Sequence, residues 1–97
     1  MIVVRNIFQI KAGMMKQAVA LIREGPPMTQ REVVRTRALT DLVSDFYTLV
    51  LEMECETLGD FEKAMQTSFA SAEWQAWYQR LTPLVQSGRR ELMSVVT

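Results

Sequence analysis

The stretch REVVRTRALTDLVSDFYTLVLEMECE, residues 31–56, decides the fold of this chain. Its two ends, residues 31–40 and 46–56, are rich in β-branched and aromatic residues, and the polar segment 41–45 between them is typical of a turn. In the second end, every other residue from Tyr47 to Cys55 is apolar. The intervening positions include the three acidic residues Glu52, Glu54 and Glu56.

An antiparallel hairpin can place three basic residues, Arg31, Arg35 and Arg37, on the same face as these glutamates. Opposite charges that face each other across strands contribute roughly 0.2–1 kcal/mol per pair. A slip of one residue would bring the arginines onto the apolar face. The stretch therefore predicts a hairpin in the register that pairs arginines with glutamates.

The residues before the hairpin predict one strand and one helix. Residues 2–11 carry apolar side chains on both faces, which favours a central strand. Residues 14–24 then have helical spacing, with an apolar stripe of Met15, Ala18, Val19 and Ile22. Gly25 suits the end of this helix, and Pro26–Pro27 prevent its continuation.

The residues after the hairpin predict a capped helical segment and a last strand. Thr57 is a helix cap with Asp60 three residues later, and Ser71 is a second cap. Apolar residues keep helical spacing as far as Val85, and Pro83 either kinks this helix or starts a last turn capped by Thr82. Gly88 is expected to end the segment, and residues 91–97 form the final strand.

The predicted order of strand, helix, strand, strand, helix, strand is that of a ferredoxin-like α+β fold. Right-handed crossovers place the first and third strands at the centre of a four-stranded antiparallel sheet, with both helices on one face. A length of 97 residues suits one domain, so we expect a single domain over residues 1–97.

Composition excludes several classes of function. Eleven basic and eleven acidic side chains cancel, which argues against a nucleic-acid partner. The chain has no histidine and one cysteine, which removes histidine-based catalysis, histidine ligands, an intrachain disulfide and a thiolate zinc cluster. We expect neither a cofactor nor a metal ion. No leader peptide and no apolar run of roughly 20 residues is recognised, so we expect a cytoplasmic protein without a membrane partner.

The sheet face without helices predicts a homodimer. We expect it to carry Arg31, Val33, Arg35, Arg37, Leu39, Thr48, Val50, Glu52, Glu54 and one side of the first strand. An apolar sheet centre open to water is unusual in a monomer, and a second copy can cover it by twofold symmetry.

Residues 68–92, SFASAEWQAWYQRLTPLVQSGRREL, contain two spaced aromatics, then Leu-x-Pro-Leu-Val and a glycine. With the element order, this segment resembles the dimeric α+β barrel superfamily, which includes antibiotic-biosynthesis monooxygenase-like, NIPSNAP-like and stress-responsive barrel proteins. The Glu-Trp-Gln run at 73–75 is similar to one found in NIPSNAP-like proteins. The resemblance implies a homodimer and leaves a range of functions from oxygenase to isomerase, because fold alone does not fix function.

The resemblance also tests individual positions. The monooxygenase branch uses no metal or flavin and relies on a polar pocket. Haem-degrading relatives place an asparagine on the first strand, which Asn6 matches, and a tryptophan and a histidine that fall near Ser68 and Tyr78 here. Those two positions depart from the pattern, which argues against haem degradation by that route.

The candidate ligand-binding residues are Asn6, Phe8, Arg37, Trp74, Trp77 and Tyr78. An asparagine amide can orient a carbonyl or hydroxyl group, and aromatic rings can wall a pocket for a planar molecule. Each also has a structural interpretation without a ligand. Asn6 can be a hydrogen-bonded core residue, Arg37 can form a cross-strand ion pair, and the aromatic residues can pack in the core.

Other polar residues are also open to two interpretations. The arginines at 5, 35 and 37 can bind an anion or pair with glutamates, and pairing is favoured. Glu52 and Glu54 can transfer protons or hold a hard cation such as magnesium, although neighbouring arginines oppose the first role. Arg89 and Arg90 are expected in a turn, where a solvated pair or a contact to the helix end is the favoured interpretation and anion binding is the second one. Cys55 is expected to be buried and unreactive.

Three hypotheses follow. The first is a homodimer that binds a small organic molecule between its sheet and second helix. The second is a cofactor-independent monooxygenase or an isomerase that acts on an activated aromatic or polyketide-like substrate, by orienting it and stabilising an oxyanion. The third is a non-catalytic structural or regulatory module, whose interior would be filled.

Overall fold

The computed structural model describes residues 1–25 and 31–97, so the predicted helix stop at Pro26–Pro27 lies outside the described residues. The elements along the chain are β1 (Ile2–Ile10), α1 (Met15–Glu24), β2 (Val33–Thr40), β3 (Thr48–Cys55), α2 (Leu58–Ala70), α3 (Ala72–Leu81), a 3₁₀ turn (Thr82–Leu84) and β4 (Val85–Ser94). None of the helices in the described ranges is long and apolar enough to cross a membrane.

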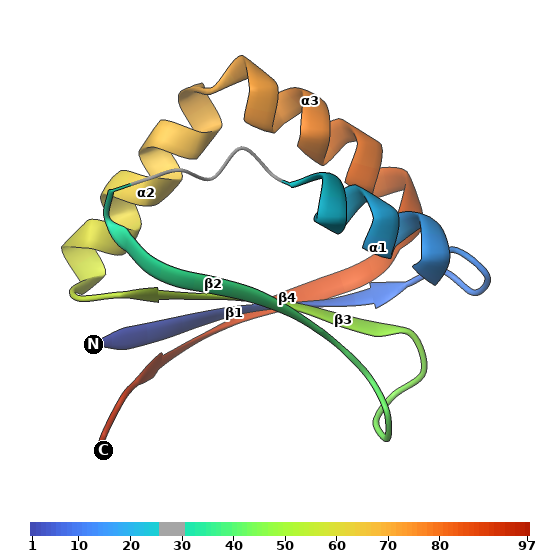
Figure 1. Cartoon of the computed structure of the whole chain (residues 1–97), viewed down its shortest axis with the longest axis horizontal. Helices are drawn as coiled ribbons and strands as arrows, with labels where there is room; N and C mark the ends of the chain where they lie inside the picture. The colour runs from blue at the N-terminus through green and yellow to red at the C-terminus, as the bar shows by residue number, and fades with distance from the viewer. Residues whose placement is uncertain (26–30) are drawn as a thin grey trace.

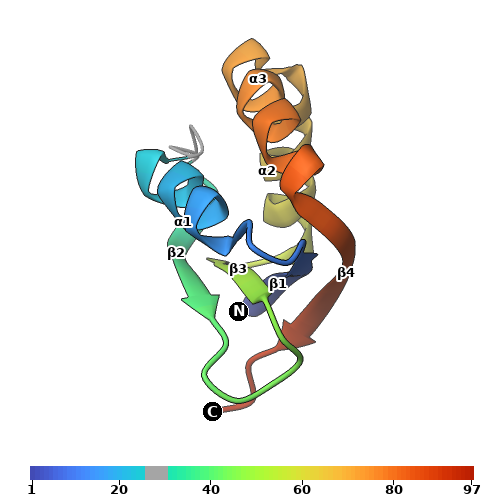
Figure 2. The ribbon, with the colours of Figure 1, turned by 90° about the vertical axis from the view of Figure 1, so that its right-hand side faces the viewer.

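The four strands form one antiparallel sheet in the order β2-β3-β1-β4, with β1 and β3 at the centre as predicted. All three helices lie on one face of this sheet, and α2 and α3 form an arch above it (Figures 1 and 2). The predicted ferredoxin-like α+β fold is therefore confirmed.

The hairpin of β2 and β3 has the predicted register. Arg35 is opposite Glu54 and Arg37 is opposite Glu52, and each pair is hydrogen bonded, at 2.8 Å and 2.7 Å. Arg31 precedes the strand instead of extending it. Cross-strand charge pairing thus selects the register that keeps the apolar positions of β3 toward the helices.

The prediction that Val33 lies on the open face is wrong. A β-bulge shifts the register between Val33 and Arg35, so that Val33 is opposite Cys55 and packs with the core under α2. The extra residue is Val34, whose side chain is 54% exposed. A bulge exchanges the faces of the residues on either side of it, and strict alternation along the sequence does not reveal this.

The predicted caps divide the second helical segment into two helices. The Thr57 hydroxyl accepts a hydrogen bond from the backbone N–H of Asp60 at 3.1 Å, and the Ser71 hydroxyl accepts one from the N–H of Trp74 at 3.2 Å. Because Ser71 has extended backbone angles, it ends α2 and begins α3 at one residue. Over residues 1–25 and 31–97 the face therefore carries three α-helices, where the sequence predicted two.

The last strand begins earlier than predicted. It starts at Val85, directly after the 3₁₀ turn that contains Pro83, and Gly88 lies inside it instead of ending a helical segment. Gly88 is opposite Phe8, and a Cβ atom there would lie 3.1 Å from Cδ1 of the Phe8 ring. Gly88 thus makes room for the Phe8 ring on the helix side of the sheet.

The core lies between the helices and the sheet in three clusters. Its buried residues are Val4, Met53, Cys55 and Phe61, then Ile10, Ala18 and Leu49, then Leu21, Trp77 and Leu81. Leu21 is a buried contact of α1 that the predicted stripe did not include.

The open face is less exposed at its centre than expected. Ile7 and Val50, which are opposite each other in β1 and β3, are already buried in the single chain. Ile7 also lies opposite Arg89 of β4, and long charged side chains can cover apolar surface with their methylene stems.

Candidate functional site

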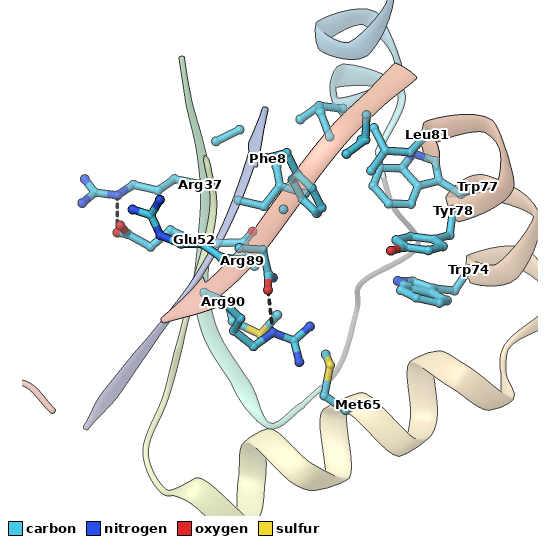
Figure 3. A pocket seen from close by; sticks show the side chains of 18 of the residues that line it. Phe8, Arg37, Glu52, Met65, Trp74, Trp77, Tyr78, Leu81, Arg89 and Arg90 are labelled. Carbon is cyan, nitrogen blue, oxygen red and sulfur yellow. Dashed lines mark hydrogen bonds and ion pairs between the residues drawn. The ribbon is translucent and has the colours of Figure 1, made fainter. Parts of the chain in front are cut away.

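A cavity of about 830 Å³ lies between the sheet and the helices. Its lining includes residues of β1, α2, α3 and β4, and Figure 3 shows the main side chains around it. Five of the six predicted site residues, Asn6, Phe8, Trp74, Trp77 and Tyr78, border the cavity from the helix side of the sheet.

The first strand turns Asn6 and Phe8 toward the helices, which settles a choice that the sequence left open. Both lie on the same face of β1 as Val4 and Ile10, because residues two apart in a strand point to one side, and Val4 and Ile10 are buried in the core on that side. The Phe8 ring packs beside the cluster of Leu21, Trp77 and Leu81. Together they bring one amide and one aromatic ring to the sheet side of the cavity.

The aromatic residues of α3 have different environments. Trp77 is buried in the core, and its indole N–H donates a hydrogen bond to the backbone carbonyl of Leu21 at 3.1 Å. Trp74 and Tyr78 stack on each other, with ring centroids 4.9 Å apart and an interplanar angle of 10°. Phe69 of α2 meets Trp74 edge-on at 5.4 Å.

The sequence left open whether these aromatic residues pack in the core or wall a pocket, and the structure distinguishes the two arrangements. Trp77 is a core residue that also borders the cavity, whereas Trp74 and Tyr78 form its aromatic wall. Figure 3 shows the indole nitrogen of Trp74 and the hydroxyl of Tyr78 directed toward the cavity.

Arg90 supplies the cationic group on the same side of the sheet. Its Nε donates a hydrogen bond to Oδ1 of Asn6 at 2.6 Å, and its guanidinium lies 5.5 Å from the centroid of the Phe61 ring. The sequence placed Arg90 in a turn, because it started the last strand at residue 91. Residues 88–91, Gly-Arg-Arg-Glu, show no apolar alternation, so no local signal places Arg90 in β4; its position follows from the pairing of β4 with β1.

Arg37 borders the cavity but is directed elsewhere. Its Nε is bonded to Glu52, and Figure 3 shows both side chains pointing away from the aromatic wall. Glu52 also pairs with Arg5 at 3.3 Å, and Glu91 lies 3.5 Å from both Arg5 and Arg89. These ion pairs form a network on the open face, and they occupy the arginines and carboxylates that were candidates for anion binding and proton transfer.

The remaining nucleophile is Cys55, a free cysteine buried against α2. Burial raises the pKa of its thiol, and the nearby carboxylates of Asp60 and Glu32 raise it further. Because the thiolate is the reactive form, this environment keeps Cys55 unreactive. Within residues 1–25 and 31–97, no group of three acidic or cysteine side chains is arranged to hold a metal ion.

The sequence matches no protein-family model and no curated protein. Its structure does match solved structures. A NIPSNAP domain protein from Burkholderia xenovorans has 16% identity and a TM-score of 0.88, over 99% of this chain and 95% of that one. A NIPSNAP family protein from Agrobacterium tumefaciens has 19% identity and a TM-score of 0.83, over 96% and 90%. An antibiotic biosynthesis monooxygenase has 19% identity and a TM-score of 0.75, over 100% of both chains.

This chain has the NIPSNAP and antibiotic biosynthesis monooxygenase fold. The resemblance predicted from residues 68–92 is confirmed at the level of the fold. At these sequence identities a shared fold does not imply a shared activity, so the function must be argued from the cavity itself.

Proposed function

We propose that this protein binds a small organic molecule in the cavity between its sheet and α3. The observation that carries the proposal is the pairing of an apolar, aromatic wall with a few polar groups that converge on one space. Trp74 and Tyr78 supply the wall from α3, and Asn6 and Arg90 supply polar groups from the sheet. Small-molecule sites have this composition, and their volumes of about 300–1,000 Å³ include the value found here.

The cavity favours a binding role over a purely structural module. A structural module would fill its interior, because close packing is the default in protein cores. Here Phe69 is 55% exposed and Tyr78 is 37% exposed on the cavity wall, although both are large apolar residues. A molecule that enters the cavity would remove these rings from water.

We further propose that the protein acts as a homodimer in the cytoplasm. The support lies in apolar side chains beside the open face. In the β2–β3 loop, Leu42 and Val43 are each 97% exposed and Phe46 is 83% exposed, and Val96 near the C-terminus is 91% exposed. Figure 1 shows this loop and the C-terminus projecting from the sheet on the side away from the helices. A second copy on the open face would lie between these two projections and would cover them.

Native mass spectrometry of gently purified protein tests both proposals at once. A species of twice 11.1 kDa with added mass supports the dimer and identifies the ligand by its mass. If the dimer carries no added mass, ligand binding is tested by the calorimetric titration described in the next subsection. A monomer at micromolar concentration contradicts the dimer. As a matched pair, Phe46→Ser should weaken the dimer, whereas Leu58→Ser, at an exposed leucine of α2, should not.

The alternative function is a cofactor-independent monooxygenase or isomerase. The specific observation that favours it is the set of hydrogen-bond donors at Asn6, Trp74 and Tyr78, which could stabilise an oxyanion on an activated aromatic substrate. One structural neighbour is described as an antibiotic biosynthesis monooxygenase. Oxygen uptake with a quinol or anthrone panel tests it. Uptake that Asn6→Ala and Tyr78→Phe leave unchanged would exclude these residues from the reaction.

A further inference from the structure

Arg90 differs from the other arginines of the sheet in having no counter-charge. Arg5, Arg35, Arg37 and Arg89 each lie within ion-pair distance of a glutamate on the open face. In the described part of the chain, no carboxylate lies within that distance of the Arg90 guanidinium, which is on the helix side. Among the residues that the structure describes, Arg90 is therefore the arginine of the sheet whose positive charge faces the cavity from the helix side without a carboxylate partner.

The contacts of Arg90 leave its outer nitrogens available. Its Nε is bonded to Asn6 at 2.6 Å, and Phe61 lies beneath the guanidinium at 5.5 Å. These two contacts orient the planar group without using the two Nη atoms. Figure 3 shows the guanidinium directed toward Met65 and Trp74, into the space between the sheet and the aromatic wall. The two Nη atoms of an arginine can bind both oxygens of one carboxylate.

The other polar groups of this space can also donate hydrogen bonds. The indole N–H of Trp74 is a donor only, and the hydroxyl of Tyr78 can donate. Neither group has a hydrogen-bond partner within the described ranges, and both are directed into the cavity (Figure 3). Glu52, the carboxylate that borders the cavity, points to the other face of the sheet. Among the described residues, the helix side of this space thus presents several donors, and the one acidic residue of the lining, Glu52, is directed to the other face of the sheet.

We propose that the ligand is a planar aromatic carboxylate, a deepening that rests on the proposed function. The carboxylate binds the Nη atoms of Arg90, and the ring packs against Trp74, Tyr78 and Phe8. A monocarboxylate matches the single unbalanced charge. A phosphate ester, which carries nearly two negative charges at neutral pH, would leave excess charge against an apolar wall.

The test is a calorimetric titration with two probes of the same shape, 2-naphthoate and the neutral 2-naphthamide. Both present the same ring system to the aromatic wall, and only the first carries a charge. We expect the wild-type protein to bind 2-naphthoate about tenfold more tightly, the effect of one charge-assisted pair at a partly exposed site. Arg90→Gln should remove this preference and should leave the affinity for 2-naphthamide within about twofold.

Two control variants separate local charge from overall charge and from folding. Arg23→Gln removes one positive charge from the exposed surface of α1 and should keep the preference. Arg90→Lys keeps the charge but replaces the planar fork, and should keep only part of the preference. The comparison of the two probes on the wild-type protein stands even if a variant fails to fold.

The outcomes distinguish this inference from the proposed function. A preference for 2-naphthoate that Arg90→Gln removes supports both. Equal binding of the two probes overturns the carboxylate and leaves the cavity as a binding site. A preference that survives Arg90→Gln also overturns the role of Arg90. No binding of either probe at millimolar concentration contradicts both the aromatic ligand and the proposed function.

Discussion

Trp77→Phe tests whether a buried indole holds α1 against α3. The Nε1–H of Trp77 donates to the carbonyl of Leu21 at 3.1 Å, near the C-terminal end of α1. The N–H of Gly25, which would complete the regular helical bond to Leu21, donates instead to Ile22 at 3.0 Å. The side chain of Trp77 therefore supplies the partner that the last turn of this helix lacks.

The expected cost has two parts. A buried carbonyl that loses its partner costs about 1–3 kcal/mol. The smaller phenyl ring leaves a gap beside Leu21 and Leu81, which adds about 1 kcal/mol. The sum of about 2–4 kcal/mol corresponds to a fall in Tm of about 10–20 °C for a chain of this size.

Trp74→Phe is the matched control, because it makes the same substitution one turn earlier in α3. Trp74 is partly exposed at the cavity wall, and its indole N–H bonds no residue in the described ranges. We expect a loss below about 1 kcal/mol. Urea unfolding followed by far-ultraviolet circular dichroism, at one protein concentration, measures both variants. Equal losses of unfolding free energy would show that the bond to Leu21 does not stabilise the fold.

Two further predictions test the cavity and the contact between α1 and α3. Gly88→Val places a side chain against the Phe8 ring and should lower the affinity for both naphthyl probes by about tenfold, whereas Ser94→Val, at the far end of β4, should not. Arg80 donates two hydrogen bonds to Glu24 and so lowers the pKa of that carboxyl. The pair should therefore stabilise the fold above the ordinary carboxyl pKa, and the Tm difference between wild type and Arg80→Gln should vanish as pH falls through the lowered value. A difference that persists in acid would contradict this assignment.

The sequence predicted the sheet because charge and hydropathy patterns agree along β3. The alternation from Leu49 to Cys55 fixes which face is apolar, and the arginines of β2 fix the register against it. It predicted the helix starts at Thr57 and Ser71 because a cap is a local hydrogen bond between residues three apart. Alternation and helix caps are set by residues close together in the sequence, so a single sequence is enough to predict them.

The bulge at Val34 and the start of β4 depend on contacts between distant residues. A bulge can be identified only from the pairing with the neighbouring strand. Val33 lies in the core because it is opposite Cys55 and packs against the cluster under α2. Gly88 resembles a helix end in the sequence, and its place opposite Phe8 depends on a strand pairing between residues 80 positions apart in the chain. Local sequence patterns therefore predict neither the bulge at Val34 nor the start of β4 at Val85.

The candidate site follows the same division. The sequence predicted that Asn6, Phe8, Trp74 and Tyr78 border one pocket, because their residue types and spacing favour it, and their role in binding stays a prediction. Arg90 could not be predicted, because its role depends on which strand residue faces the helices. Successive side chains of a strand point to opposite faces, so once β4 begins at Val85, Arg89 joins the ion pairs of the open face and Arg90 joins Asn6. The same two arginines in a turn would be equivalent, and it is the early start of β4 that gives the cavity its unbalanced charge.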